Sequence, residues 1–378
     1  MLIALLLFST LFLAYFNGAN DNFKGVATLY GSGTLSYRAA ISIATFATFA
    51  GSIAAIFLAQ GLIVSFSGKG LVPQDVAGAT TFLTAVSFGA GGTVLLATRL
   101  GFPISTTHSL VGGLLGAGLM SIGWEVNFSR MGGVFLVPLL LSPFIAFVLG
   151  ASAYWVFTRL RRRLGFTKET CVCVGEQKQL IPIIAVSGAG SAGGINFAEM
   201  LPPLNTQVTV ANANDCVEIY TDKVWGIHIQ KILDFAHTLS AVAVSFARGL
   251  NDTPKIAGLL VAVQAINMRG GMVAIAVGMA LGGLLNARRV AETMSNKITQ
   301  INPGQGLSAN LATSFLVLIA SKFGVPVSTT HVSVGSIFGI GMVSGRRDVK
   351  VIKSIILSWL ITLPVAMILS ATIYFLIS

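Results

Sequence analysis

Ten long apolar stretches follow one another along the chain, and short polar connections separate most of them. They cover residues 1–33, 38–66, 80–97, 104–122, 131–158, 236–266, 270–286, 307–321, 327–344 and 352–377. A helix needs about 20 apolar residues to cross roughly 30 Å of hydrocarbon, so this pattern predicts a bundle of membrane-spanning helices. The first stretch lacks a basic flank and a small-residue cleavage site, so we expect a retained membrane helix rather than a signal peptide.

One long polar region, residues 159–235, interrupts the apolar pattern. Four arginines stand at its start: Arg159, Arg161, Arg162 and Arg163. Positive charge beside membrane helices marks the cytoplasmic side, so we expect this region inside the cell and both termini outside. The sequence therefore predicts a multi-pass protein of the cell membrane, with a membrane repeat over 1–158, a cytoplasmic central region over 159–235 and a second membrane repeat over 236–378.

Composition supports a membrane protein and argues against a soluble domain or a nucleic-acid-binding protein. Hydrophobic residues make up 54% of the chain and charged residues only 10%, against roughly 25% charged residues in a soluble domain. The net charge of +11 could suggest nucleic acid, but the predicted topology places 16 of the 24 Lys and Arg residues inside and three outside. Membrane orientation therefore explains the charge, and no nucleic acid is expected. The three cysteines all lie in the central region, in neither a metal-site nor a disulfide pattern.

Two polar motifs occur twice, in the same order. Residues 18–24 (GANDNFK) parallel residues 249–255 (GLNDTPK), and residues 103–108 (PISTTH) parallel residues 326–331 (PVSTTH). The offsets are 231 and 223 residues, and the second match extends through glycines: Gly112 with Gly335, and Gly116 with Gly339. The chain is therefore predicted to contain an internal repeat.

The number of crossings in each half sets the relation between the repeats. Whether the STTH segments are re-entrant tips or breaks between full spans, each half crosses the membrane an odd number of times, which inverts the second half. We therefore expect an all-α polytopic membrane protein made of two inverted-topology repeats with broken or re-entrant helices. Such folds are typical of secondary transporters, with a site near the middle of the membrane.

The first motif places carboxylates inside apolar stretches. The polar pair in each copy is Asn20 with Asp21, and Asn251 with Asp252. A buried charge in a membrane helix usually marks a pathway or a binding site, and these oxygens suit an alkali cation such as Na⁺. The simpler alternative is charge neutralisation by ion pairs, Asp21 with Lys24 and Asp252 with Lys255. Both interpretations can hold together, with the two lysines providing charge balance.

The second motif has the features of an oxyanion site. A proline ends the preceding structure, and three hydroxyl residues follow in each copy: Ser105, Thr106, Thr107, Ser328, Thr329 and Thr330. Hydroxyl groups and the free N–H groups of a helix start would bind a tetrahedral anion. The alternative is ordinary helix capping. His108 and His331 are either proton-linked or orient the loops, and we favour orientation; Arg248 and Arg99 either face the anion or extend to an interface.

At these residues the chain resembles the PiT family of cation-coupled inorganic phosphate transporters. The resemblance covers both membrane repeats and implies symport of phosphate with Na⁺ or H⁺ by a homodimer in the lipid bilayer. Carried over by position, Asp21 and Asp252 serve phosphate and cation, their neighbouring asparagines bind Na⁺, and the six hydroxyl residues bind phosphate. Lys24 and Lys255 stand where many relatives carry asparagine, so an ammonium group could replace a bound cation or balance the phosphate charge.

Three alternatives differ from phosphate symport. A sulfate or other oxyanion permease would use the same scaffold, although a spare carboxylate acceptor favours the protonated phosphate ion. An anion channel would need a continuous polar lining rather than two motif pairs. A membrane enzyme would need one asymmetric nucleophile–base pair, whereas here the serine and histidine are duplicated, so no enzyme and no cofactor beyond a coupling Na⁺ are expected.

Overall fold

The computed structural model describes residues 2–163, 173–174, 208–209, 223–224, 227–261, 267–298, 301–345 and 349–378. The chain forms two compact units, residues 1–165 with 231–378, and residues 166–230. The smaller unit contains two antiparallel strand pairs, β1 (Cys173–Val174) with β2 (Val208–Thr209), and β3 (Lys223–Val224) with β4 (Ile227–His228). The central region also contains a glycine-rich run in the sequence, residues 188–194, which we interpret as a linker and which lies outside the described residues.

The larger unit is built from helices. Its first part contains α1 (Leu2–Asp21), α2 (Ala27–Gly31), α3 (Tyr37–Leu58), α4 (Gln60–Phe66), α5 (Gln74–Gly78), α6 (Thr80–Leu100), α7 (Thr106–Ile122), α8 (Phe128–Arg130) and α9 (Val137–Arg163). Its second part contains α10 (Ile229–Ala257), α11 (Met268–Asn286), α12 (Arg288–Glu292), α13 (Pro303–Lys322), α14 (Thr329–Ser344) and α15 (Val349–Ile377). Among the described residues, six helical segments are long and apolar enough to span a membrane. The predicted all-α polytopic membrane class is confirmed.

The two copies of the first motif differ in their backbone. In the first copy α1 ends at Asp21 and a 3₁₀ turn follows over Asn22–Gly25, as expected for a broken helix. In the second copy α10 continues to Ala257 with Pro254 inside it. Proline lacks the N–H that would bond to the Leu250 carbonyl, and its ring crowds that carbonyl, so the helix continues here with an interrupted hydrogen-bond ladder. Only the first copy thus has the expected break.

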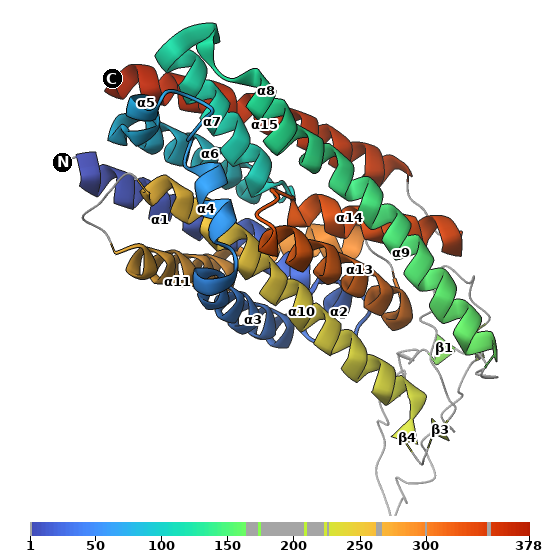
Figure 1. Ribbon diagram of the computed structural model, residues 1–378. Helices are drawn as coiled ribbons and strands as arrows, with labels where there is room; N and C mark the ends of the chain where they lie inside the picture. The colour runs from blue at the N-terminus through green and yellow to red at the C-terminus, as the bar shows by residue number, and fades with distance from the viewer. Residues whose placement is uncertain are drawn as a thin grey trace, which may run out of the picture. The chain divides into compact units, whose positions relative to one another are not determined.

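Each copy of the second motif lies at the tip of a helical hairpin. Helix α6 ends at Leu100 and is capped by Gly101, whose φ of 74° is in the left-handed region that favours glycine, and α7 begins after the loop. Helix α13 is followed in the same way by Gly324, with a φ of 67°, and then by α14. Figure 1 shows both tips in the middle of the helical bundle. The sequence allowed either a tip or a break between spans, and the structure has tips.

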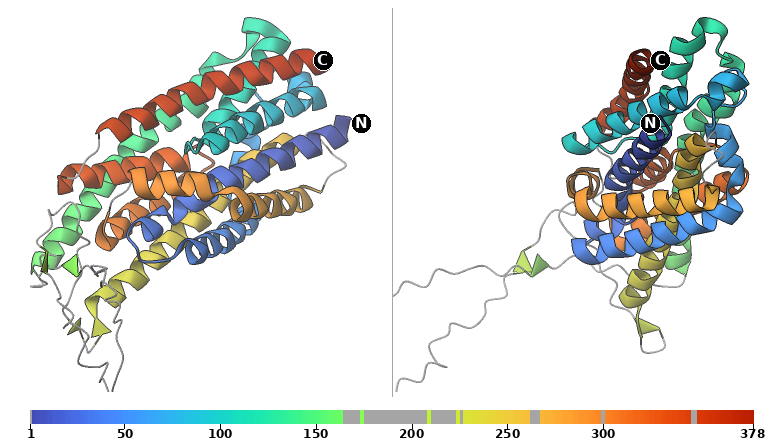
Figure 2. Two further views of the ribbon diagram at one scale, coloured as in Figure 1. Left: turned by 180° about the vertical axis from the view of Figure 1, so that it is seen from behind. Right: turned by 90° about the vertical axis from the view of Figure 1, so that its left-hand side faces the viewer.

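Helices of the two halves run in opposite directions. In Figure 1, α1 runs away from the labelled N-terminus toward the middle of the bundle, and α10 runs the opposite way; α9 and α15 are likewise opposed. The rear view in Figure 2 shows the same opposition. This arrangement is consistent with inverted repeats.

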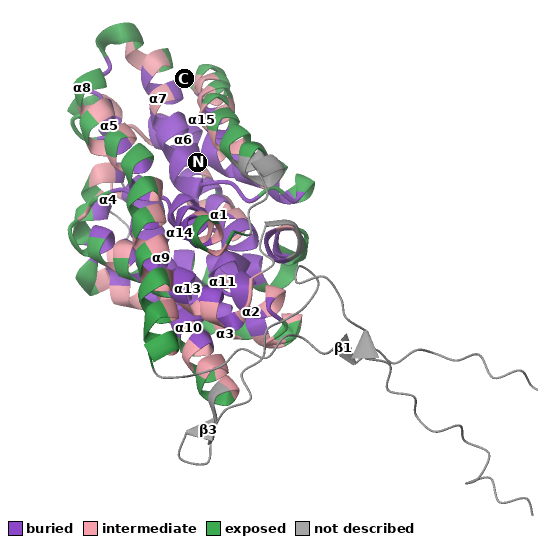
Figure 3. Ribbon diagram, turned by 90° about the vertical axis from the view of Figure 1, so that its right-hand side faces the viewer, coloured by how far each residue is buried: buried purple, intermediate pink, exposed green. Residues whose placement is uncertain are grey.

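The last long helix of each half packs against the hairpin of the other half. Helix α15 crosses α7 so closely that a Cβ atom at Gly116 would overlap the carbonyl of Met367. Helix α9 crosses α14 in the same manner, and a Cβ atom at Gly339 would overlap the carbonyl of Phe147. The duplicated glycines therefore mark two equivalent helix crossings. Figure 3 shows buried residues concentrated in the hairpins, whereas α9 and α15 carry many exposed residues on their outer faces.

Candidate functional site

The two hairpin tips contact each other through threonine hydroxyl groups. The Thr107 hydroxyl donates to the backbone oxygen of Val327 at 3.3 Å, and the Thr330 hydroxyl donates to the backbone oxygen of Ile104 at 3.1 Å. Each bond joins one half of the chain to the other. The structure thus brings both copies of the second motif, 223 residues apart in the sequence, into one site.

Serine side chains start the two helices at the tips. The Ser105 hydroxyl accepts from the N–H of His108 at 3.1 Å, and the Ser328 hydroxyl accepts from the N–H of His331 at 3.2 Å. This is the capping role considered from the sequence, and it applies to the serines. It fixes the N-terminal ends of α7 and α14, with their partial positive charge, at the centre of the site.

Asn20 and Asn251 hold the loops that precede these helices. Asn20 donates to the backbone oxygen of Phe102 at 3.0 Å and accepts from the N–H of Ile104 at 3.1 Å. Asn251 donates to the backbone oxygen of Val327 at 3.3 Å, and its side-chain oxygen accepts from the Ser321 hydroxyl at 3.2 Å. In this conformation both asparagines act on the loops, so their predicted role as Na⁺ ligands stays a prediction.

The carboxylates of the first motif pair with the lysines three residues later. Lys24 contacts one carboxylate oxygen of Asp21, and Lys255 lies 3.3 Å from one carboxylate oxygen of Asp252. The other Asp21 oxygen accepts from the Thr106 hydroxyl at 3.3 Å. The ion pairs considered as the simpler alternative are therefore present in both halves, and they lie at the hairpin tips.

Arg248 belongs to the site, although the sequence left its position open. It is fully buried, and its Nη1 lies 3.2 Å from the Thr329 hydroxyl and 3.8 Å from an Asp21 carboxylate oxygen. Its counterpart at the 231-residue offset is Asn17, which donates to the Thr106 hydroxyl at 2.9 Å. Sequence reasoning did not single out Asn17, but the repeat offset could have identified it. Arg99, by contrast, is exposed at the end of α6.

The site is enclosed and carries an excess of positive charge. The predicted site residues, together with Arg248, are at most 4% exposed. Three cationic side chains, Lys24, Arg248 and Lys255, face two carboxylates. Within the described part of the chain, three buried polar atoms of this group have no hydrogen-bond partner: Nε and Nη2 of Arg248, and Oδ2 of Asp252. A buried polar atom without a hydrogen bond destabilises the protein unless a ligand provides the partner. The site therefore offers a ligand two donor nitrogens on Arg248 and one acceptor oxygen on Asp252.

The two motif histidines lie against each other. The ring centroids of His108 and His331 are 4.4 Å apart, and His331 stacks on Trp359 of α15 at 3.6 Å. This places an aromatic cluster beside the two hairpin tips. The packing agrees with the orienting role favoured from the sequence, without testing a proton-linked role.

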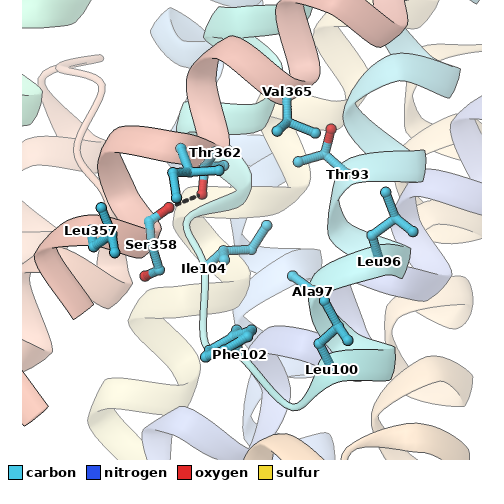
Figure 4. Close-up of a pocket in the computed structure, with 11 residues that line it drawn as sticks. Thr93, Leu96, Ala97, Leu100, Phe102, Ile104, Leu357, Ser358, Thr362 and Val365 are labelled. Carbon is cyan, nitrogen blue, oxygen red and sulfur yellow. Dashed lines mark hydrogen bonds between the residues drawn. The ribbon is translucent and has the colours of Figure 1, made fainter. Parts of the chain in front are cut away.

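An apolar cavity of about 300 Å³ adjoins the first hairpin loop. It lies between α6 and α15, and Phe102 and Ile104 of the loop form part of its wall (Figure 4). Leu96, Leu100 and Ile361 are among its other lining residues. A cavity with such a lining does not suit a charged oxyanion, so the buried polar cluster is the better candidate site.

The chain is similar to known proteins over nearly its whole length. A family model described as the phosphate transporter family matches residues 17–370. A protein of Chlamydia pneumoniae named "Putative phosphate permease" is 28% identical over 407 aligned positions, which cover 95% of this chain and 94% of the relative. A protein of Pyrococcus abyssi named in the same way is 27% identical, with 96% and 94% covered. In fold, the chain is similar to a solved sodium-dependent phosphate transporter, with a TM-score of 0.74, 24% identity, and 99% and 98% of the two chains covered.

Proposed function

Because the chain belongs to the phosphate transporter family, we propose that it imports inorganic phosphate together with a coupling cation, Na⁺ or H⁺, by alternating access. The family-model match over residues 17–370 confirms the family that the duplicated motifs predict. Relatives named as phosphate permeases and a structural neighbour named as sodium-dependent support the substrate and a cation-coupled process.

One observation within the site supports phosphate over sulfate. Arg248 and Asp252 lie one turn apart on α10, on the same face of the helix, and both carry buried atoms without a partner among the described residues. The guanidinium offers two N–H donors to anionic oxygens, while the carboxylate oxygen offers an acceptor for a P–OH hydrogen. Hydrogen phosphate has both kinds of group, and sulfate lacks the hydrogen.

The way in which the site is closed supports alternating access. The candidate residues are buried at the junction of two hairpin tips, which belong to different halves of the chain. Separating the tips on one side would expose the polar cluster to that side only. In this role the chain forms a homodimer in the cell membrane, with both termini outside and the central region inside.

The test is uptake of radiolabelled phosphate by purified protein in proteoliposomes, with sulfate as competitor. Asp252→Asn removes the charged acceptor, and a hydrogen bond to a charged group contributes roughly 1.5–3 kcal/mol. We therefore expect phosphate uptake to fall about tenfold or more and sulfate to compete more effectively. Asp75→Asn, an exposed aspartate on α5, is the matched control and should leave both values unchanged. Normal phosphate uptake and selectivity by a folded Asp252→Asn protein would contradict the proposed site.

A further inference from the structure

The coordination of Lys24 resembles that of a bound alkali cation. Its ammonium nitrogen contacts three oxygens: a carboxylate oxygen of Asp21, the backbone oxygen of Ile104, and the Thr330 hydroxyl at 2.9 Å. An ammonium group has three N–H donors, so this oxygen set satisfies all of them. Carboxylate, carbonyl and hydroxyl oxygens on interrupted backbone are also the ligands from which transporters build Na⁺ sites.

Lys255 has the same three kinds of ligand in the other half. Its nitrogen lies 3.3 Å from a carboxylate oxygen of Asp252, 2.7 Å from the backbone oxygen of Val327 and 2.7 Å from the Thr107 hydroxyl. In both halves the carboxylate and carbonyl come from the lysine's own half, and the hydroxyl comes from the other half. An ion pair serving only to neutralise charge would not require this repeated set.

The two ammonium groups also exclude a second cation from the same oxygens. Both lysines are at most 3% exposed, so water does not screen their charge. A Na⁺ ion sharing the Asp21 carboxylate oxygen and the Ile104 carbonyl would face a like charge at contact distance in a poorly polarisable interior. The three cationic side chains and two carboxylates already leave one net positive charge for an anion, without a bound metal ion.

We propose that the ammonium groups of Lys24 and Lys255 occupy the two cation positions of the site as built-in cations, so that this chain transports its oxyanion without Na⁺. This inference rests on the proposed phosphate transport and removes Na⁺ from the two coupling ions considered there. The predicted Na⁺ ligands Asp21 and Asp252 then serve to hold the lysines.

Phosphate uptake into proteoliposomes tests this with Na⁺ present or fully replaced by choline, under a proton gradient. Wild-type uptake in choline should be within twofold of uptake in Na⁺. In choline, the double variant Lys24→Asn/Lys255→Asn should take up phosphate at least tenfold more slowly than the wild type. In high Na⁺ the variant should regain part of this uptake. Lys322→Asn, an exposed lysine at the end of α13, is the matched control and should show no Na⁺ dependence.

Tenfold stimulation of wild-type uptake by Na⁺ would overturn the inference. Absence of phosphate uptake under every gradient would refute the proposed function instead, and binding of ²²Na⁺ to the purified protein would then decide the lysine question. No saturable binding by the wild type supports built-in cations, and saturable binding refutes them. Size-exclusion chromatography shows whether the double variant folds. If it does not fold, the wild-type measurements by themselves still test the inference.

Discussion

At the scale of single residues, the site depends on side chains that hold the hairpin loops as well as on those that would meet the ion. Asn20 is fully buried and makes three hydrogen bonds, to the Thr98 hydroxyl, to the Phe102 oxygen and from the Ile104 N–H. The Ile104 carbonyl then accepts from both Lys24 and Thr330. Asn20 therefore positions the loop from which Lys24 takes one of its oxygens.

Asn20→Ala should destabilise the protein as well as reduce transport. The change leaves the buried N–H of Ile104 without its partner, at roughly 1–3 kcal/mol. It also removes the hydrogen bonds to the Thr98 hydroxyl and to the partly buried Phe102 oxygen. We expect a loss of at least about 2 kcal/mol, measured by thermal unfolding in detergent. Asn286→Ala, which removes an exposed bond to the Tyr15 hydroxyl, should change stability by no more than about 0.5 kcal/mol. Equal effects of the two substitutions would refute the positioning role.

The sequence could predict some residues of the site and not others, for a physical reason. Asp21 and Lys24 stand out because charge inside an apolar stretch is costly, and the threonines stand out because their motif is duplicated. Thr98 and Ser321 do not stand out, because isolated hydroxyl residues are common in membrane helices and often bond to their own backbone. Both do so here, and only the fold shows that Thr98 also accepts from Asn20 and that Ser321 also donates to Asn251.

At the scale of elements, apolar patterning predicts where helices occur better than where they break. The pattern predicts one segment over 327–344, and α14 occupies Thr329–Ser344. It also predicts one segment over 38–66, yet α3 ends at Leu58 and α4 begins at Gln60. The break is at Ala59, with φ −130° and ψ 33°, and no proline stands there. Gly61, two residues later, packs closely against Gly324 of the second hairpin loop. Tertiary packing sets that boundary, so the local sequence does not reveal it.

The glycine crossings give a prediction at this scale. Gly116→Ala would place a methyl group on the Met367 carbonyl and push α15 away from α7, and overpacking of this kind costs about 1–3 kcal/mol. Gly92→Ala on α6 is the control, because its added Cβ would lie 3.6 Å from Leu369, an ordinary contact. We expect a lower unfolding temperature for Gly116→Ala alone. A Gly116→Ala protein as stable as the wild type would show that the crossing is looser than described.

At the scale of the whole molecule, the two halves share a design and differ at one informative pair of positions. The two lysines, and the threonines Thr107 and Thr330, make equivalent contacts in both halves. In contrast, Asn17 in the first half corresponds to Arg248 in the second. This difference gives the site its third cationic group, the Arg248 guanidinium, which is carried by α10. The repeated motifs predict that the two halves are related. They do not show whether Arg248 faces the site or the membrane interface, and only its complete burial excludes the interface.

The orientation of the whole molecule can be tested with its own cysteines. All three lie in the central region, which the charge pattern predicts to be cytoplasmic. A membrane-impermeant maleimide should therefore label the wild type in inside-out vesicles and not in intact cells. Trp124→Cys adds a thiol at an 84% exposed position after α7, on the face predicted to be outside, and it should be labelled in intact cells. Labelling of the wild type in intact cells would reverse the topology.

The crossing of each last helix onto the other half's hairpin has a consequence for biogenesis. The glycine face of α7 around Gly112 and Gly116 is covered by α15, which follows both hairpins in the sequence. Until α15 has been synthesised, this glycine face of α7 has no partner within the chain. The first half therefore cannot complete its packing by itself. A chain cut short before α15 would leave this glycine face of α7 uncovered, so the packing of the first hairpin is complete only after α15 has been made.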